Sequence, residues 1–121
     1  MTKNVLEVHP GVCGFTARIE AVSEDKRNVV LRIESECETI RALAARLPLP
    51  VDGYEEIRDG FAGTVHQAVR ETLKGCCSGC VVPSGLFKAM QVAAGLALPA
   101  DAGIRFAAPL REPRSEEGVS G

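Results

Sequence analysis

Three of the five cysteines in this 121-residue chain fall within residues 75–85, here called the cysteine stretch. They are Cys76, Cys77 and Cys80, and the last two form a Cys-x-x-Cys pair. A two-residue gap allows both sulfurs of such a pair to reach one ion, and thiolates are donors that suit zinc and iron–sulfur clusters. The pair therefore indicates a sulfur-ligated site to which other parts of the chain must contribute.

The two remaining cysteines lie beside a predicted turn and a predicted helix start. Cys13 follows the turn signal His-Pro-Gly at residues 9–11 and stands at the entry to a predicted strand. Cys37 falls in the first turn of a predicted helix, where the helix dipole favours a thiolate. A side chain at either position can project from the end of a packed layer.

These placements predict one metal site at one end of the fold. The predicted ligands are Cys13, Cys37 and Cys80, with Cys77 as the first candidate for a fourth ligand and Cys76 or His66 behind it. The predicted cofactor is a [2Fe–2S] cluster or zinc, because both bind cysteine sulfurs.

Two runs of alternating apolar and polar residues predict an antiparallel hairpin. The apolar positions are Phe15, Ala17, Ile19 and Ala21 in the first run and Val29, Leu31 and Ile33 in the second. Residues 23–28 form a polar turn between the runs, and residues 4–8 suggest a further short strand.

A first helix is predicted directly after the hairpin. Ser35 and Glu38 fit a capping box, in which the hydroxyl takes a free backbone amide and the carboxylate reaches back to the cap. The apolar face of this helix ends before Pro48. Residues 48–60 then read as a connection with at most one short element, in which Asp52, Glu55 and Glu56 are solvated.

Two more helices flank the cysteine stretch. The apolar positions of residues 61–73, from Phe61 to Leu73, share one face of a helix, and Gly75 suits the left-handed residue that ends it. The next helix opens at Pro83 or Ser84 and ends near Gly95.

The expected fold is therefore α+β, a small antiparallel sheet built on the hairpin and covered on one face by three helices. Ile104 and Phe106 indicate a final edge strand. Residues 1–109 are expected to form a single domain. Residues 110–121 are expected to be a flexible C-terminal tail, because the sequence there has no apolar periodicity.

Composition argues against several functions. A formal net charge of −2 and an aromatic content of 4% provide neither a basic surface nor stacking rings for nucleic acid. No stretch resembles a signal peptide or a membrane span, which predicts a cytoplasmic protein. Thiols stay reduced in that compartment, so clustered cysteines favour metal ligation or redox chemistry over disulfides.

The chain has a Cys-Gly before a strand, a hairpin, a cysteine at a helix start and a cysteine before a later helix. These are Cys13-Gly14, Cys37 and Cys80, and their order resembles the U-type iron–sulfur cluster scaffold proteins. The resemblance implies that three cysteines carry a nascent [2Fe–2S] cluster, with a cysteine desulfurase and a cluster acceptor as partners. Residues 80–85 and 94–99 separately resemble a small uncharacterised family of anaerobe proteins, which implies no activity.

Two other functions remain open. Cysteine is among the most buried residue types, so the thiols can be inert fillers in a non-enzymatic structural or oligomerisation domain, including a homo-oligomer. Cys77 and Cys80 ahead of a helix also suit a thiol oxidoreductase, because helix amides stabilise a thiolate. Thioredoxin-like proteins place such a pair after an early strand, whereas a helix precedes it here. Metal or cluster binding is thus the preferred hypothesis.

Overall fold

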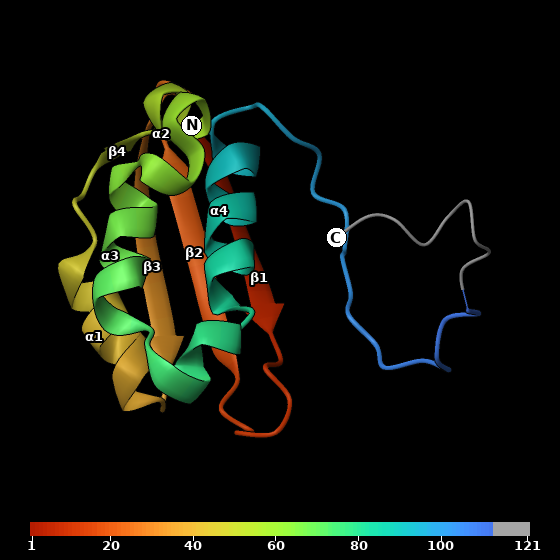
Figure 1. Ribbon diagram of the computed structural model, residues 1–121. Coiled ribbons are helices and arrows are strands. Elements are labelled where there is room, and N and C mark those ends of the chain that lie inside the picture. The colour runs from red at the N-terminus through yellow and green to blue at the C-terminus, as the bar shows by residue number, and fades with distance from the viewer. Residues whose placement is uncertain (113–121) are drawn as a thin grey trace.

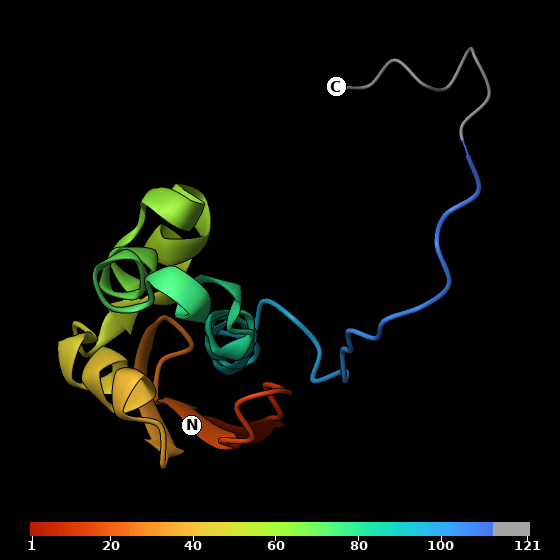
Figure 2. The same ribbon diagram turned by 60° about the horizontal axis from the view of Figure 1, so that its bottom comes forward.

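A four-stranded antiparallel sheet forms the centre of the computed structural model, which describes residues 1–112. The strands, in sheet order, are β1 (Thr2–Val8), β2 (Ala17–Ser23), β3 (Asn28–Ser35) and β4 (Val51–Asp52). The helices lie over one face of this sheet (Figures 1 and 2): α1 (Glu38–Arg46), α2 (Gly53–Asp59), α3 (Thr64–Thr72) and α4 (Val82–Ala93), with the short 3-10 helices η1 (Gly60–Ala62) and η2 (Gly75–Gly79). The predicted α+β class is confirmed, with four α-helices among the described residues where three were expected.

Alternation along β2 and β3 separates the two faces of the sheet. The side chains buried beneath the helices are Ala17, Ile19, Ala21, Val29 and Leu31, as the sequence pattern predicted. Phe15 departs from that pattern. It precedes β2 and is exposed, because strand pairing starts only at Ala17, which pairs with both β1 and β3.

The turn between β2 and β3 is shaped by Asp25. Its carboxylate accepts hydrogen bonds from the Asn28 side chain at 2.8 Å and from the backbone N–H groups of Asn28 at 2.8 Å and Arg27 at 2.9 Å. The Asn28 side chain and these amides hold the pKa of Asp25 well below its usual range. The predicted polar turn is therefore an ordered connection.

The helix α4 packs most deeply on the sheet. Its apolar stripe is fully buried and consists of Val82, Leu86, Ala89, Met90 and Ala93. Each buried Leu or Met side chain contributes about 1.5–3 kcal/mol. No helix within residues 1–112 combines the length and the hydrophobicity needed to cross a membrane.

A glycine permits the close approach of α4 to the sheet. A Cβ on Gly85 would lie 2.7 Å from Val8 Cγ2 and 3.2 Å from Leu6 Cδ1. Both of these methyl groups belong to β1, and Val8 is itself part of the buried core. Because Gly85 has no side chain, α4 can lie this close to β1.

The start of α1 differs from the predicted capping box. The helix begins at Glu38 with Cys37 as its N-cap residue, and no side chain caps it. Ser35 still belongs to β3, and its hydroxyl accepts a hydrogen bond from the backbone N–H of Cys37 at 3.1 Å. Because β3 runs on to Ser35, Cys37 lies just before the helix and not in its first turn.

The connection predicted at residues 48–60 is more ordered than expected, because β4 and α2 both form within it. Asp52 caps α2, since its Oδ1 accepts hydrogen bonds from the backbone N–H groups of Tyr54 at 3.0 Å and Glu55 at 3.1 Å. The acidic residue predicted to be solvated is therefore a helix cap.

Glu56 was also expected to be solvated, but it is buried. Its carboxylate accepts hydrogen bonds from the backbone N–H of Val65 at 2.6 Å and from the Thr64 hydroxyl at 2.9 Å. It thereby satisfies the free amides at the start of α3, where the helix dipole favours a negative charge. Phe61, predicted on the buried face of this helix, lies in η1 and is 82% exposed, because α3 begins only at Thr64.

Beyond α4 the predicted edge strand does not form. Residues 95–112 contain neither helix nor strand, and Ile104 and Phe106 are exposed. Gly95, with a φ of 74°, follows the end of α4, and the chain then leads away from the sheet (Figure 1). Most of the predicted tail, residues 113–121, lies outside the described residues.

We expect the substitution Gly85→Ala to lower the free energy of unfolding by about 1–3 kcal/mol, the usual cost of overpacking a core. The new methyl group would press on the buried Val8 side chain, and this outweighs the better helix propensity of alanine. Urea unfolding followed by circular dichroism measures the change. Gly103→Ala is the control, since nothing lies within 4 Å of its Cβ position. Equal stability of the two variants would contradict the close approach of α4.

The substitution Glu56→Gln should lower the free energy of unfolding by about 1–3 kcal/mol, because an uncharged amide cannot accept all of the buried hydrogen bonds at the start of α3. Glu55→Gln, at the exposed neighbouring position, should change it by less than about 0.5 kcal/mol. Thermal unfolding of both variants tests this, and a neutral Glu56→Gln would show that the cap does not stabilise α3.

Candidate cysteine site

Antiparallel pairing gathers three parts of the chain at one end of the sheet. Ala17 pairs with Val8 of β1 and with Ser35 of β3, so the three residues form one row across the strands. Cys13 lies in the loop between β1 and β2, and Cys37 comes just after β3. Figure 1 shows this loop, the start of α1 and the connection from α3 to α4 at the same end of the molecule.

The short helix η2 brings the cysteine stretch against α1. Cys77 Sγ lies 4.0 Å from Thr39 Oγ1, which is a weak hydrogen bond from the thiol to the hydroxyl. Thr39 belongs to the first turn of α1, beside Cys37. Both Cys37 and Cys77 are half-buried and pack against the hydrophobic core. This contact therefore brings the second and third cysteine-bearing segments together.

Cys80 lies between η2 and α4 and is also half-buried against the core. Burial raises the pKa of its thiol, and the backbone N–H of Val82 at the start of α4 only partly offsets this effect. Negative charge on Cys13, Cys37 or Cys77 raises that pKa further. A thiolate is therefore not favoured at Cys80 in the free protein, although the residue precedes a helix.

All four predicted ligands thus lie in one region, since Cys13, Cys37 and Cys77 are near enough to act electrostatically on Cys80. Cys76 is exposed, and its thiol is not among those that act on Cys80. Within residues 1–112, no three His, Cys, Asp or Glu side chains stand close enough together to hold a metal ion. The cysteine thiols of the described part of the chain therefore share one region but do not form a metal-binding cluster.

Cys13 is the most open of the four. It is exposed, and it lies in a turn closed by a hydrogen bond from the Gly14 N–H to the Gly11 carbonyl at 2.9 Å. Both glycines have positive φ, 94° for Gly11 and 72° for Gly14, and no atom lies within 4 Å of either Cβ position. Because little packs around this turn, Cys13 can change position at a small cost in packing.

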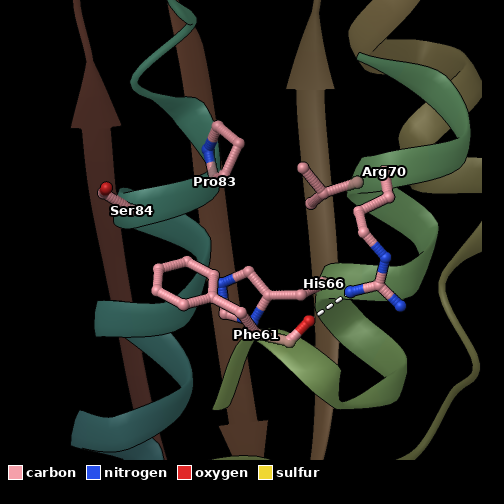
Figure 3. A pocket seen from close by; sticks show the side chains of 6 residues that line it. Phe61, His66, Arg70, Pro83 and Ser84 are labelled. Atoms are coloured by element: carbon pink, nitrogen blue, oxygen red, sulfur yellow. Dashed lines mark hydrogen bonds between the residues drawn. The ribbon is translucent and has the colours of Figure 1, made fainter. Parts of the chain in front are cut away.

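His66 belongs to an aromatic cluster between α3 and α4 (Figure 3). Its Nδ1 donates a hydrogen bond to the Gly60 carbonyl at 3.0 Å, which places a proton on Nδ1. Its ring centroid lies 4.6 Å from that of Phe61 and 4.9 Å from that of Phe87. The imidazole is therefore already engaged in packing between the helices and in a hydrogen bond, so the cysteines are better metal ligands than His66.

A shallow hollow beside this cluster has a volume of about 170 Å³. The residues that line it are Phe61, His66, Val69, Arg70, Pro83 and Ser84, and the Arg70 guanidinium donates to the Phe61 carbonyl (Figure 3). Small-molecule sites usually enclose roughly 300 Å³ or more. The hollow is therefore a weaker candidate site than the cysteine end.

Thr39 is the site residue that sequence reasoning missed. No motif marks it, because its contact with Cys77 exists only once η2 has folded against α1. The one signal in the sequence is its place beside Cys37, on the helix flank that also contains the buried Ile40.

At neutral pH, iodoacetamide should modify Cys13 and Cys76 several-fold faster than Cys80. The first two are exposed, whereas Cys80 is half-buried and its raised pKa leaves little thiolate. The rate at Cys80 should still be rising above pH 9, because its pKa is raised from the ordinary value of 9.0. Tandem mass spectrometry of the reduced, metal-free protein measures each rate, and the same reaction in urea is the control. Fastest modification at Cys80 would refute this description of the site.

Comparisons with known proteins place the chain in a family. Residues 4–106 match the model of a family of unknown function, DUF6951, and this range contains all five cysteines and all four helices. A search of curated proteins found no match, and a search of solved structures found none either. The chain therefore belongs to the family of unknown function DUF6951.

Proposed function

We propose that this protein binds zinc or a [2Fe–2S] cluster through Cys13, Cys37 and Cys80, with Cys77 as the fourth ligand. The observation that carries the proposal is that three separate cysteine-bearing segments lie at the same end of the fold. Thiolate donors in groups of three or four suit zinc and iron–sulfur clusters and do not suit magnesium or calcium.

The donors differ in how they are held. Cys37, Cys77 and Cys80 pack against the core, so their backbone positions are set by α1, η2 and α4. Cys13 sits on an open turn outside the core. In the proposal, the sulfurs of Cys37, Cys77 and Cys80 move together onto the bound group, and the turn of Cys13 closes over it. Binding also removes the thiol protons, because cysteine ligates as a thiolate.

Metal binding is compatible with the raised pKa of the Cys80 thiol. A metal ion supplies the missing positive charge directly and deprotonates a coordinating thiol. If the bound group is a cluster, its sulfide would come from a donor such as a cysteine desulfurase, and an acceptor protein would be the further partner.

Anaerobic reconstitution tests the proposal. The protein should retain zinc, or iron with acid-labile sulfide and a visible absorption spectrum, and elemental analysis gives the amounts. Cys80→Ser should weaken zinc binding at least about a hundredfold, since losing a group that merely orients a ligand already costs about 10–100-fold. The matched control Cys76→Ser should bind as the unmodified chain does.

Circular dichroism of both variants separates loss of binding from loss of fold. Two results would count against the proposal. One is an unmodified chain that retains neither metal nor sulfide after reconstitution. The other is a pair of serine variants that bind equally well, which would remove Cys80 from the ligand set.

A further inference from the structure

The outer edge of β1 is open to pairing. Within residues 1–112, β1 is the first strand of the sheet and pairs only with β2, through the full register from Thr2 with Ser23 to Val8 with Ala17. An antiparallel strand directs alternate backbone N–H and C=O groups to each side, so this edge presents unpaired groups along its length. Leu6, which faces the helices, is only partly buried here.

The segment after α4 exposes several large apolar side chains. We call residues 95–112 the C-terminal arm, and its exposed large apolar residues are Leu96, Leu98, Ile104, Phe106 and Leu110. Leu98 is 86% and Ile104 is 80% exposed. Ile104, Phe106 and Ala108 alternate with Gly103, Arg105 and Ala107, the pattern of a strand with one apolar face. The family match extends to residue 106, so most of this pattern belongs to the family domain.

The arm begins beside the open edge. The Thr2 hydroxyl, at the start of β1, donates a hydrogen bond to the carbonyl of Ala93, the last residue of α4. From there the arm leads away from the body in both views (Figures 1 and 2). The residues between Ala94 and Gly103 can span at most roughly 30 Å. That reach is enough to place residues 103–108 on a neighbouring molecule.

We propose that residues 103–108 of one copy pair with the β1 edge of a second copy as a fifth strand, in a reciprocal exchange that forms a dimer. The exchange supplies partners for the backbone groups of both edges at once. It also places the apolar face of Ile104 and Phe106 beside the half-buried Leu6, on the side of the sheet that α4 covers. The charged Arg105 then faces the solvated side, with the exposed Lys3 and Glu7 of β1.

A second copy fits better than the chain's own edge. An arm that added to its own β1 would turn back directly after α4, beside Thr2. Instead, residues 95–100 lead the arm outward. Apart from the hydrogen bonds that end α4, the backbone hydrogen bond of this stretch joins the Ala100 N–H to the Leu98 carbonyl, within the arm itself. An apolar segment that extends away from its own body is the starting geometry of arm exchange.

Two measurements on the full chain test the exchange, both with reductant present to prevent disulfide dimers. Light scattering after size-exclusion chromatography should give twice the chain mass for the unmodified protein. The double substitution Ile104→Asp and Phe106→Asp should give the mass of one chain, because burying two carboxylates beside Leu6 of the second copy would be too costly. Val12→Asp, which changes an exposed apolar residue of the β1–β2 loop, should remain a dimer.

Photo-crosslinking then identifies the contact. Phe106 is replaced by p-benzoylphenylalanine, and equal amounts of ¹⁴N- and ¹⁵N-labelled chains are mixed and irradiated. Peptides of β1 joined to position 106 in mixed isotope pairs are the expected product. A monomeric unmodified chain, a dimer that survives the double substitution, or β1 cross-links found only in same-isotope pairs would each overturn the proposal. The last result would assign the arm to its own edge.

Discussion

The close packing of α4 on β1 and β2 is the constraint on which the other features depend. Gly85 lets the helix approach so closely that an added Cβ would lie 2.7 Å from Val8 Cγ2, and the stripe from Val82 to Ala93 is fully buried. An interior packed this densely allows one position of the helix along the sheet. The start of α4 therefore stays at the end of the sheet where β1 finishes and α1 begins.

The geometry of the cysteine end follows from that position. Cys80 lies two residues before the start of α4, and the pairing of Ala17 with both Val8 and Ser35 sets the ends of the other two segments. The contact between Cys77 and Thr39 then joins the two halves of the chain. Cys13 alone is outside this framework, because its turn packs against nothing that holds it. The site proposed here thus combines a rigid side with a movable one.

The other end of α4 has a different consequence. Its last turn is joined to the start of β1 through Thr2, so the C-terminal arm leaves the body beside an open sheet edge. One helix therefore positions both the proposed ligands at its start and the proposed exchange arm at its end. The two proposals remain independent, since the arm contains no cysteine.

Local pattern predicted much of this fold. Strand alternation predicted the hairpin and its buried face, and helical periodicity predicted the stripe of α4, because both patterns arise from neighbours close in sequence. The extent of local order was less well predicted. The structured α2 and the later start of α1 depend on Asp52 capping one helix and on β3 continuing to Ser35, which local propensity does not resolve.

The sequence by itself determined which residues can ligate a metal, because cysteine sulfur is present at only five positions and the Cys-x-x-Cys spacing is local. The tertiary structure decided which cysteine-bearing segments lie at the same end, since strand register and helix packing join segments that are far apart in the chain. It also decided the roles of Glu56, Phe61 and Thr39. A side chain has the same chemistry in every fold, and only its surroundings make the Glu56 carboxylate a helix cap, leave the Phe61 ring exposed and place the Thr39 hydroxyl against a thiol.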